Sequence, residues 1–436
     1  MSWVVVAASR PLAAEAQQAV VKVPRIGFIG DTAWRPMWAR KRIDIGWRDL
    51  LAAAGYALFP GSRATAQQSA EQTWPGSDDV IACLSVRSGL DLMLGQLGLP
   101  VGSEVLVSAV TIEDMVTILR HHGLVAVPMD VNPSDMSPNF KDIDRAITSR
   151  TKAMLIAPLF GARLPLRPFA EKAQEHGLLL WEDCAQAFDG RYAGHPEADA
   201  VMFSFGPIKT ATALGGGLLR VRDRELLTRM RSAQETWPLS NSRSFVSRVA
   251  RYAVLKFLSG RIACRVFLEI LKLLGRDPDR VVNSAVRNFP GDELIAQLRH
   301  RSPTAMLRLL ARRLRTFRTD RLDRRARLGR RLANRLALVV ECPGDAAAEH
   351  SFWVFPVCVR DSAPILTAVR AAGFDASAGS QLRAVPTADG SLQSTPNAAR
   401  ITTEAVFLPL YPELTEPAVD RLADILTSLR QSTRKV

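Results

Sequence analysis

Three short stretches decide the fold class: 178–190 (LLLWEDCAQAFDG), 201–209 (VMFSFGPIK) and 215–221 (GGGLLRV). Each contains an apolar run of the length of a β-strand, and the first two runs end in polar residues. In a sheet of parallel strands the carboxyl ends of the strands meet at one edge, where ligands bind. We therefore expect the polar side chains that follow these runs to lie together at such an edge.

The same alternation of strand-length and helix-length segments begins at residue 78. Apolar runs at 105–107, 125–127 and 153–156 are separated by amphipathic patterns such as the one at 115–122. Strands that alternate with helices in this way are typical of a mainly parallel sheet covered by helices. The sequence therefore predicts an α/β fold.

Asp183, Ser204 and Lys209 are the residues of this region that can carry chemistry. Pyridoxal phosphate needs a lysine amine for its aldehyde, because arginine is never deprotonated in proteins. Its pyridine nitrogen needs a buried carboxylate, and its phosphate needs hydroxyl and backbone N–H groups, best at the start of a helix. Lys209, Asp183 and Ser204 meet these needs in that order. An acid at a strand end is often only a helix cap, and a single lysine is usually a surface residue. The prediction therefore depends on the three residues occurring together.

Four motifs of the chain resemble those of the DegT/DnrJ/StrS aminotransferases. They are GSEVLV at 102–107, EDCAQA at 182–187, FSFGPIK at 203–209 and VFLPLYPELT at 406–415. The resemblance covers residues 78–235 and 345–430, in the order of the family. It implies a fold-type-I pyridoxal phosphate enzyme, with a mainly parallel sheet flanked by helices and a smaller α+β C-terminal domain.

The resemblance also implies roles for single residues. Lys209 would form the Schiff base with the cofactor and carry the proton of the amino transfer. Asp183 would pair with the pyridinium nitrogen, Gln186 would contact the ring near its hydroxyl, and Ser204 would hold the phosphate. In the dehydratases of the family a histidine takes the place of the lysine, so Lys209 favours amino transfer.

Three positions depart from the family pattern. The phosphate loop, usually Ser-Gly-Thr before a helix, is SVR at 85–87, so we expect Arg87 or Ser88 to bind the phosphate at the start of that helix. Ile112 stands where an aromatic residue usually stacks on the ring, and an aliphatic side chain covers the ring without stacking. Thr210 follows the lysine in place of an asparagine. These departures indicate a divergent branch of the family.

The net charge of +14 comes from one block of the chain. Residues 241–340 hold 24 lysines and arginines against 7 acidic residues, so the remaining residues are close to neutral together. Within the block, charged residues recur at helical spacing in 249–274, opposite apolar residues. We expect the block to pack on the body of the protein or on a second copy, or to lie with 249–274 on anionic lipid. Nucleic-acid binding is not expected, because no recognition fold accompanies the arginines.

The pattern divides the chain into four predicted parts. They are an N-terminal arm over 1–77, a large cofactor-binding domain over 78–235, a basic helical insertion over 236–340 and a small C-terminal domain over 341–436. Residues 1–20 lack the cationic start and the long apolar stretch of a signal peptide, so we expect a frayed extension or a misassigned start there.

Composition and cysteine pattern narrow the class of protein. The chain is 47% hydrophobic and 23% charged, which excludes wholesale disorder. Its five cysteines include no C-x-x-C pair, so neither a disulfide framework nor a metal site is expected, and a reducing cytoplasm fits best. No apolar run is long enough to predict a membrane-spanning helix.

These observations predict an aminotransferase that moves an amino group from an amino acid, such as glutamate, to a nucleotide-linked keto-sugar. The family resemblance implies a homodimer. Two alternatives stay open at this point. One is an aminotransferase that acts on a lipid-linked acceptor at the membrane face, and the other is a pyridoxal-phosphate-binding regulator or scaffold without turnover.

Overall fold

The computed structural model describes residues 35–75, 77–279, 281–282, 293–379, 382–387, 390–391 and 394–433. The predicted extension at 1–20 therefore lies outside the described residues. The predicted boundaries at 77/78, 235/236 and 340/341 stay predictions. Residues 35–436 group into one compact unit, which does not separate these parts.

A central sheet organises the described residues, with strand order β1-β9-β8-β7-β5-β2-β4. The strands are β1 (Val80–Cys83), β2 (Glu104–Ser108), β4 (Val125–Met129), β5 (Thr151–Ile156), β7 (Leu179–Asp183), β8 (Ala200–Ser204) and β9 (Gly217–Val221). Neighbours from β4 to β8 are parallel, whereas β9 runs antiparallel to both β8 and β1. The prediction of a mainly parallel α/β sheet is confirmed.

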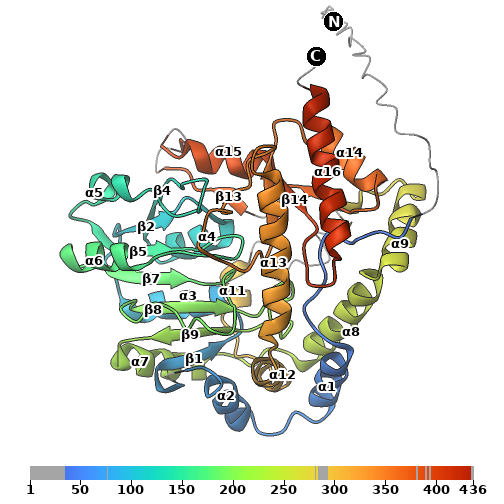
Figure 1. Cartoon of the computed structure of the whole chain (residues 1–436). Coiled ribbons are helices and arrows are strands. Elements are labelled where there is room, and N and C mark those ends of the chain that lie inside the picture. Colours follow the sequence, from blue (N-terminus) through green and yellow to red (C-terminus); the bar gives the residue numbers. More distant parts are fainter. Residues whose placement is uncertain are drawn as a thin grey trace, which may run out of the picture. The chain divides into compact units, whose positions relative to one another are not determined.

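Both faces of the sheet are buried, because its strands are apolar at successive positions. Side chains of a strand alternate between faces, so Leu180 and Trp181 enter two separate cores. Helices close each core (Figure 1). One core contains α3 (Val86–Leu97), α4 (Glu113–His121) and α7 (Arg224–Glu235), and the other contains α2 (Arg63–Glu71), α6 (Arg167–Glu175), α8 (Ser242–Leu258) and α12 (Thr304–Arg315).

The N-terminal segment packs on the basic block. Helix α1 (Trp47–Leu58) and α2 both contact α12. The buried Asp49 carboxylate accepts hydrogen bonds from Arg312 and Arg313 at 2.8 Å each. Several arginines of the block therefore neutralise acids within the molecule.

A second, smaller sheet lies in the C-terminal region. It has the order β11 (Phe355–Cys358), β14 (Ala405–Leu408) and β12 (Ser377–Ala378), and it shares a core with α13 (Thr319–Leu336), α14 (Ser362–Ala371) and α16 (Glu416–Thr433). Helices α13 and α16 run side by side (Figure 1), joined by ion pairs such as Arg331–Asp420. This arrangement fits the predicted α+β character of the C-terminal part.

Short elements complete the fold. They are β3 (Val110–Ile112) paired with β13 (Leu382–Ala384), β6 (Ala162–Arg163) paired with β10 (Glu349–His350), and the helices α5 (Ile143–Ala146), α11 (Leu294–Leu298) and α15 (Pro396–Glu404). The β3–β13 pair joins the C-terminal region to the loop that carries Ile112. The C-terminal region is thereby anchored near the sheet edge that carries the polar residues.

The basic segment 249–274 is interrupted. Helix α8 ends at Leu258, and α9 (Arg261–Leu273) begins after Gly260, so the charges do not form one continuous helical stripe. Phe245, Val249 and Tyr252 bury one side of α8 in a core of the central sheet. Within the described part of the chain, no helix combines the length and the apolar character needed to cross a bilayer.

Candidate functional site

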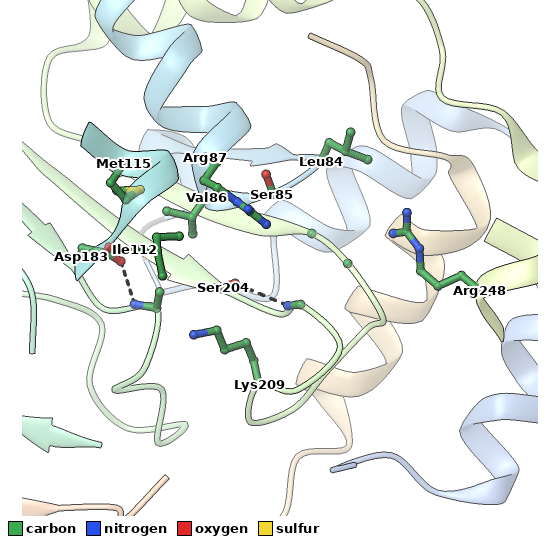
Figure 2. A pocket seen from close by; sticks show the side chains of 14 residues that line it. Leu84, Ser85, Val86, Arg87, Ile112, Met115, Asp183, Ser204, Lys209 and Arg248 are labelled. Atoms are coloured by element: carbon green, nitrogen blue, oxygen red, sulfur yellow. Dashed lines mark hydrogen bonds between the residues drawn. The ribbon is translucent and has the colours of Figure 1, made fainter. Parts of the chain in front are cut away.

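One cavity lies at the sheet edge where β1, β7 and β8 end. The space between its lining atoms measures about 540 Å³, a volume that includes open solvent at the mouth. Its lining is Leu84, Ser85, Val86, Arg87, Ile112, Met115, Asp183, Ala185, Ser204, Gly206, Lys209, Gly215, Gly216 and Arg248. Figure 2 shows how these side chains face one another. The lining contains three cationic side chains and one carboxylate, so the cavity favours an anionic ligand.

Lys209 lies in the turn after β8, where its N–H donates to the Gly206 carbonyl at 3.0 Å. Burial lowers the pKa of its amine to about 8, the Asp183 carboxylate opposes this shift, and the Arg87 guanidinium reinforces it. The amine also lies 4.2 Å from the centre of the Trp353 ring. A lysine with this pKa is partly deprotonated near neutral pH and can act as a nucleophile or a base.

Asp183 closes β7 and faces the cavity, whereas its neighbour Glu182 points to the other face of the sheet. One Asp183 oxygen accepts a hydrogen bond from the Ala185 N–H at 3.0 Å. Burial raises the pKa of Asp183, against the lowering effects of that hydrogen bond and of Lys209. Glu182 is fully buried and accepts hydrogen bonds from the Tyr192 hydroxyl at 3.0 and 3.1 Å. The alternation of the strand thus gives the two adjacent acids different surroundings.

Helix α3 begins at the cavity. Ser85 is its N-cap, and the Ser85 hydroxyl accepts a hydrogen bond from the Ser88 N–H at 3.1 Å. Arg87 lines the cavity and forms an ion pair with Asp114. Ser88 is fully buried outside the lining, and its hydroxyl donates to the Leu298 carbonyl. Of the two residues predicted to bind the phosphate, Arg87 therefore faces the cavity and Ser88 does not.

Of the remaining predicted site residues, two line the cavity and one lies outside it. Ser204 and Ile112 line the cavity, and Met115 extends the wall that Ile112 begins. Gln186 lies outside the lining, because its side-chain oxygen accepts a hydrogen bond from the Phe160 N–H at 2.9 Å. The structure thus brings Lys209, Asp183, Ser204, Arg87 and Ile112 together and leaves Gln186 and Ser88 aside.

Two cationic groups near the site were not predicted from the sequence. Arg248 reaches the cavity from α8, and it is one of many arginines in the basic block, so no local signal marks it. The Lys41 amine lies 3.5 Å from the centre of the Trp353 ring that also contacts Lys209. It is buried with no hydrogen-bond partner among the described residues, and burial lowers its pKa. Lys41 belongs to a segment in which the sequence indicated no chemical motif.

Comparisons with known proteins indicate the same family as the sequence motifs. Residues 55–247 match the DegT/DnrJ/EryC1/StrS aminotransferase family. GDP-perosamine synthase of Caulobacter vibrioides is 31% identical over 159 residues, which are 36% of this chain and 43% of that protein. The erythromycin biosynthesis sensory transduction protein EryC1 of Saccharopolyspora erythraea is 34% identical over 201 residues, 44% of this chain and 53% of that protein. The chain thus matches about half the length of these curated relatives.

Solved structures extend the likeness to nearly the whole chain. The aminotransferase TlmJ of Streptoalloteichus hindustanus superposes with a TM-score of 0.66 over 93% of this chain and 100% of that one. The two sequences are 19% identical, so this similarity concerns the fold. It supports the fold type that the sequence motifs implied.

Proposed function

Because residues 55–247 match the DegT/DnrJ/EryC1/StrS aminotransferase family, we propose that the chain is a pyridoxal-phosphate-dependent aminotransferase of this family. The observation that carries this proposal is the cavity in which the Lys209 amine, with a pKa of about 8, faces the Asp183 carboxylate. A buried amine and a buried acid of this kind at the carboxyl edge of a parallel sheet are what amino transfer requires.

The residues of the cavity fit the cofactor. Asp183 would hold the pyridine nitrogen in its protonated form, because a carboxylate stabilises that charge. Arg87, Ser204 and the start of α3 would hold the phosphate, and Ile112 would cover the ring. When bound, pyridoxal phosphate supplies an electron sink for negative charge at the reacting carbon.

Lys209 would move the proton of the reaction. Its pKa of about 8 lies close to the operating pH, where a group both takes up and returns a proton efficiently. Asp183 is the one acidic side chain of the lining; burial raises its pKa, and the nearby Lys209 opposes this shift. The apolar side chains of Ile112 and Met115 would keep water from this part of the cavity.

The proposed donor is an amino acid such as glutamate, and the proposed acceptor is a nucleotide-linked keto-sugar in polysaccharide or glycoconjugate biosynthesis. The name of the perosamine relative supports an acceptor joined to a nucleoside diphosphate. A cationic site suits such a doubly charged group. We further propose a cytoplasmic homodimer.

The experiment that tests the function is a visible spectrum of the purified protein with pyridoxal phosphate, before and after glutamate is added. We expect an absorption band that Lys209→Ala removes and that Lys152→Ala, at an exposed lysine, leaves unchanged. Glutamate should convert this band to that of the aminated cofactor. A band that no amino acid converts would favour the regulator or scaffold without turnover, and no band in the wild type would refute the proposal.

The alternative proposal is that the enzyme works at the membrane face, on a lipid-linked acceptor in place of the nucleotide-linked one. The observation behind it is a set of exposed apolar side chains on α8 and α9, called the apolar row below. Its members, with their exposed fractions, are Val254 58%, Phe257 64%, Ile262 62%, Val266 45%, Ile270 48% and Leu273 86%. The α9 members recur every three or four residues and so lie on one side of that helix.

The positive charge of α8 and α9 favours an anionic lipid surface, rather than a second copy of the chain, as the binding partner of this row. Between residues 242 and 273 there are seven lysines and arginines, and Glu269 is the one acidic residue. Two copies of such a surface would repel each other, whereas anionic headgroups attract it. An apolar row flanked by cations is the pattern of helices that lie in the plane of a membrane interface.

Vesicle flotation tests this second proposal. The wild type should bind vesicles that contain phosphatidylserine, and the pair Ile262→Asp and Ile270→Asp should abolish binding. The control is Leu338→Asp, at a leucine that is 91% exposed on another part of the chain. A wild type that ignores anionic vesicles would refute the membrane contact, and a double variant that turns a dimer into a monomer would assign the row to a subunit interface instead.

A further inference from the structure

Arg248 brings the basic helix α8 into the cofactor cavity. Its side chain lines the cavity together with Ser85, Gly215 and Gly216. One guanidinium nitrogen, Nη1, donates to the Leu214 carbonyl at 3.1 Å, which fixes the direction of the side chain. A Cβ at Gly215 would stand 2.7 Å from the Met306 sulfur and 2.8 Å from Nη1, so glycine at this position leaves room for the guanidinium in the direction that it takes.

The Arg248 guanidinium lacks a counter-ion within the described part of the chain. Two other largely buried arginines have one: Arg313 pairs with Asp49 at 2.8 Å, and Arg40 pairs with Asp375 at 2.9 Å. A third, Arg325, donates to the Ser351 carbonyl and the Thr210 hydroxyl instead. Burial lowers the pKa of Arg248, and the nearby Arg251 adds to this effect. A buried cation without an anion is costly, so an anionic ligand that enters the cavity gains from its presence.

The position of Arg248 indicates which end of the cofactor it meets. In Figure 2, Asp183 and Ile112 lie on one side of Lys209, and Arg248 lies on the other side, beyond Ser85. Asp183 suits the ring nitrogen, so the opposite side of the cavity is left for the phosphate. There the start of α3 offers its N-terminal dipole, and Arg248 offers donors for two phosphate oxygens.

We propose that Arg248 binds the phosphate of the cofactor, so that the basic insertion is part of the cofactor site. This inference rests on the proposed function. It also accounts for the departure at 85–87: where the family pattern has a threonine hydroxyl, this chain has Arg87, already paired with Asp114, and a second cation comes from α8. Removal of α8 would therefore disturb the cofactor site as well as the apolar row, whereas the point substitutions Ile262→Asp and Ile270→Asp leave Arg248 in place.

The test compares two ligands, pyridoxal phosphate and pyridoxal, which lacks the phosphate. Equilibrium dissociation constants are measured by absorbance for the wild type, Arg248→Met, Arg248→Lys and the control Arg251→Met. Arg251 is exposed and lies three residues later on the same helix. We expect Arg248→Met to weaken pyridoxal phosphate about 10- to 100-fold, the size of one charge-assisted hydrogen bond to an ion, and to leave pyridoxal unchanged. Arg248→Lys should recover part of the loss, and Arg251→Met should behave like the wild type.

The other possible results contradict either this inference or the proposed function. An equal loss for both ligands would mean that Arg248 only supports the shape of the cavity, and no loss for either would mean that it does not reach the phosphate. In both cases the inference fails and the proposed function stands. A wild type that binds neither ligand would refute the proposed function itself. If Arg248→Met does not fold by circular dichroism, the comparison of the two ligands is made on Arg248→Lys, which keeps the charge but loses the paired donors.

Discussion

Replacement of the Lys209 amine should stabilise the cofactor-free protein at neutral pH. The structure buries this amine beside Trp353 and lowers its pKa from 10.5 to about 8. The folded protein therefore holds the charged form less well than the unfolded chain does. Lys209→Met keeps an unbranched side chain that is one heavy atom shorter and removes the group that titrates, so it removes this cost.

The size and sign of the effect follow from linkage. Between pH 8 and pH 10.5 the unfolded chain keeps the Lys209 proton that the folded protein has released, so the stability of the wild type rises with pH in this window. A shift of this size corresponds to about 3 kcal/mol at pH 7 and to less than about 1 kcal/mol at pH 10. The free energy of unfolding of Lys209→Met, relative to the wild type, should therefore fall by about 2 to 3 kcal/mol between pH 7 and pH 10.

Urea denaturation of both proteins without cofactor, at several pH values from 7 to 10, measures this difference. Groups that titrate alike in both proteins cancel in the comparison. Lys152→Met is the matched control, because Lys152 is exposed, and its difference from the wild type should not change with pH. A Lys209→Met difference that stays constant from pH 7 to pH 10 would show that the Lys209 amine titrates normally, and the argument for its role as a base would fail.

Close packing and a buried ion pair elsewhere in the protein give the remaining predictions. Gly329→Ala should destabilise the protein by about 1 to 3 kcal/mol in urea denaturation, because a Cβ there would overlap the Phe352 ring. Gly95→Ala is the matched control: its Cβ would meet the nearest side-chain atom at an ordinary 3.5 Å, so the gain in helix propensity should stabilise the protein by about 0.5 to 1 kcal/mol. Equal effects at both glycines would contradict the packing argument. Arg313→Met should cost about 3 to 5 kcal/mol, since it leaves the buried Asp49 with one of its two arginine partners, and a loss below about 1 kcal/mol would show that Arg312 suffices for this acid.

The basic block has more than one role. In α12 and α13, arginines such as Arg313 and Arg331 pair with acids elsewhere in the molecule, so a large part of the block's charge is neutralised internally. In α8 and α9 the cations stand beside an open apolar row. Net charge alone does not separate these two cases, because it does not record where the opposite charges lie in space.

Local patterns were sufficient for the main features of the fold and for the core of the site. Alternating apolar runs predicted the strands, because the period of a strand is set by its own backbone. The order of the motifs around Asp183 and Lys209 predicted that these residues meet, because parallel strands bring their carboxyl ends to one edge. The helix start at 85–87 was also local, since Ser85 caps α3 with its own side chain.

Other features depended on how elements pack. Arg87 and Ser88 are consecutive on α3, and successive residues of a helix point about 100° apart, so the docking of the helix decides which one faces the cavity. Gly217 sets that docking, because a Cβ there would stand 2.7 Å from the Val86 nitrogen. Gln186 lies outside the cavity because its side chain accepts a hydrogen bond from the backbone N–H of Phe160, which is far from it in sequence.

By itself, the sequence determined the α/β class, the strand ends that carry Asp183 and Ser204, and the lysine at the centre of the site. Only the tertiary structure decided that Arg248 lines the same cavity as Lys209 and that Lys41 contacts the same Trp353 ring as Lys209, although the two come from segments on either side of Lys209 in the chain. The physical reason is the distance along the chain over which each effect acts. Backbone periodicity and helix caps act over a few residues, whereas the neighbours of a buried cation are chosen by the packing of the whole chain.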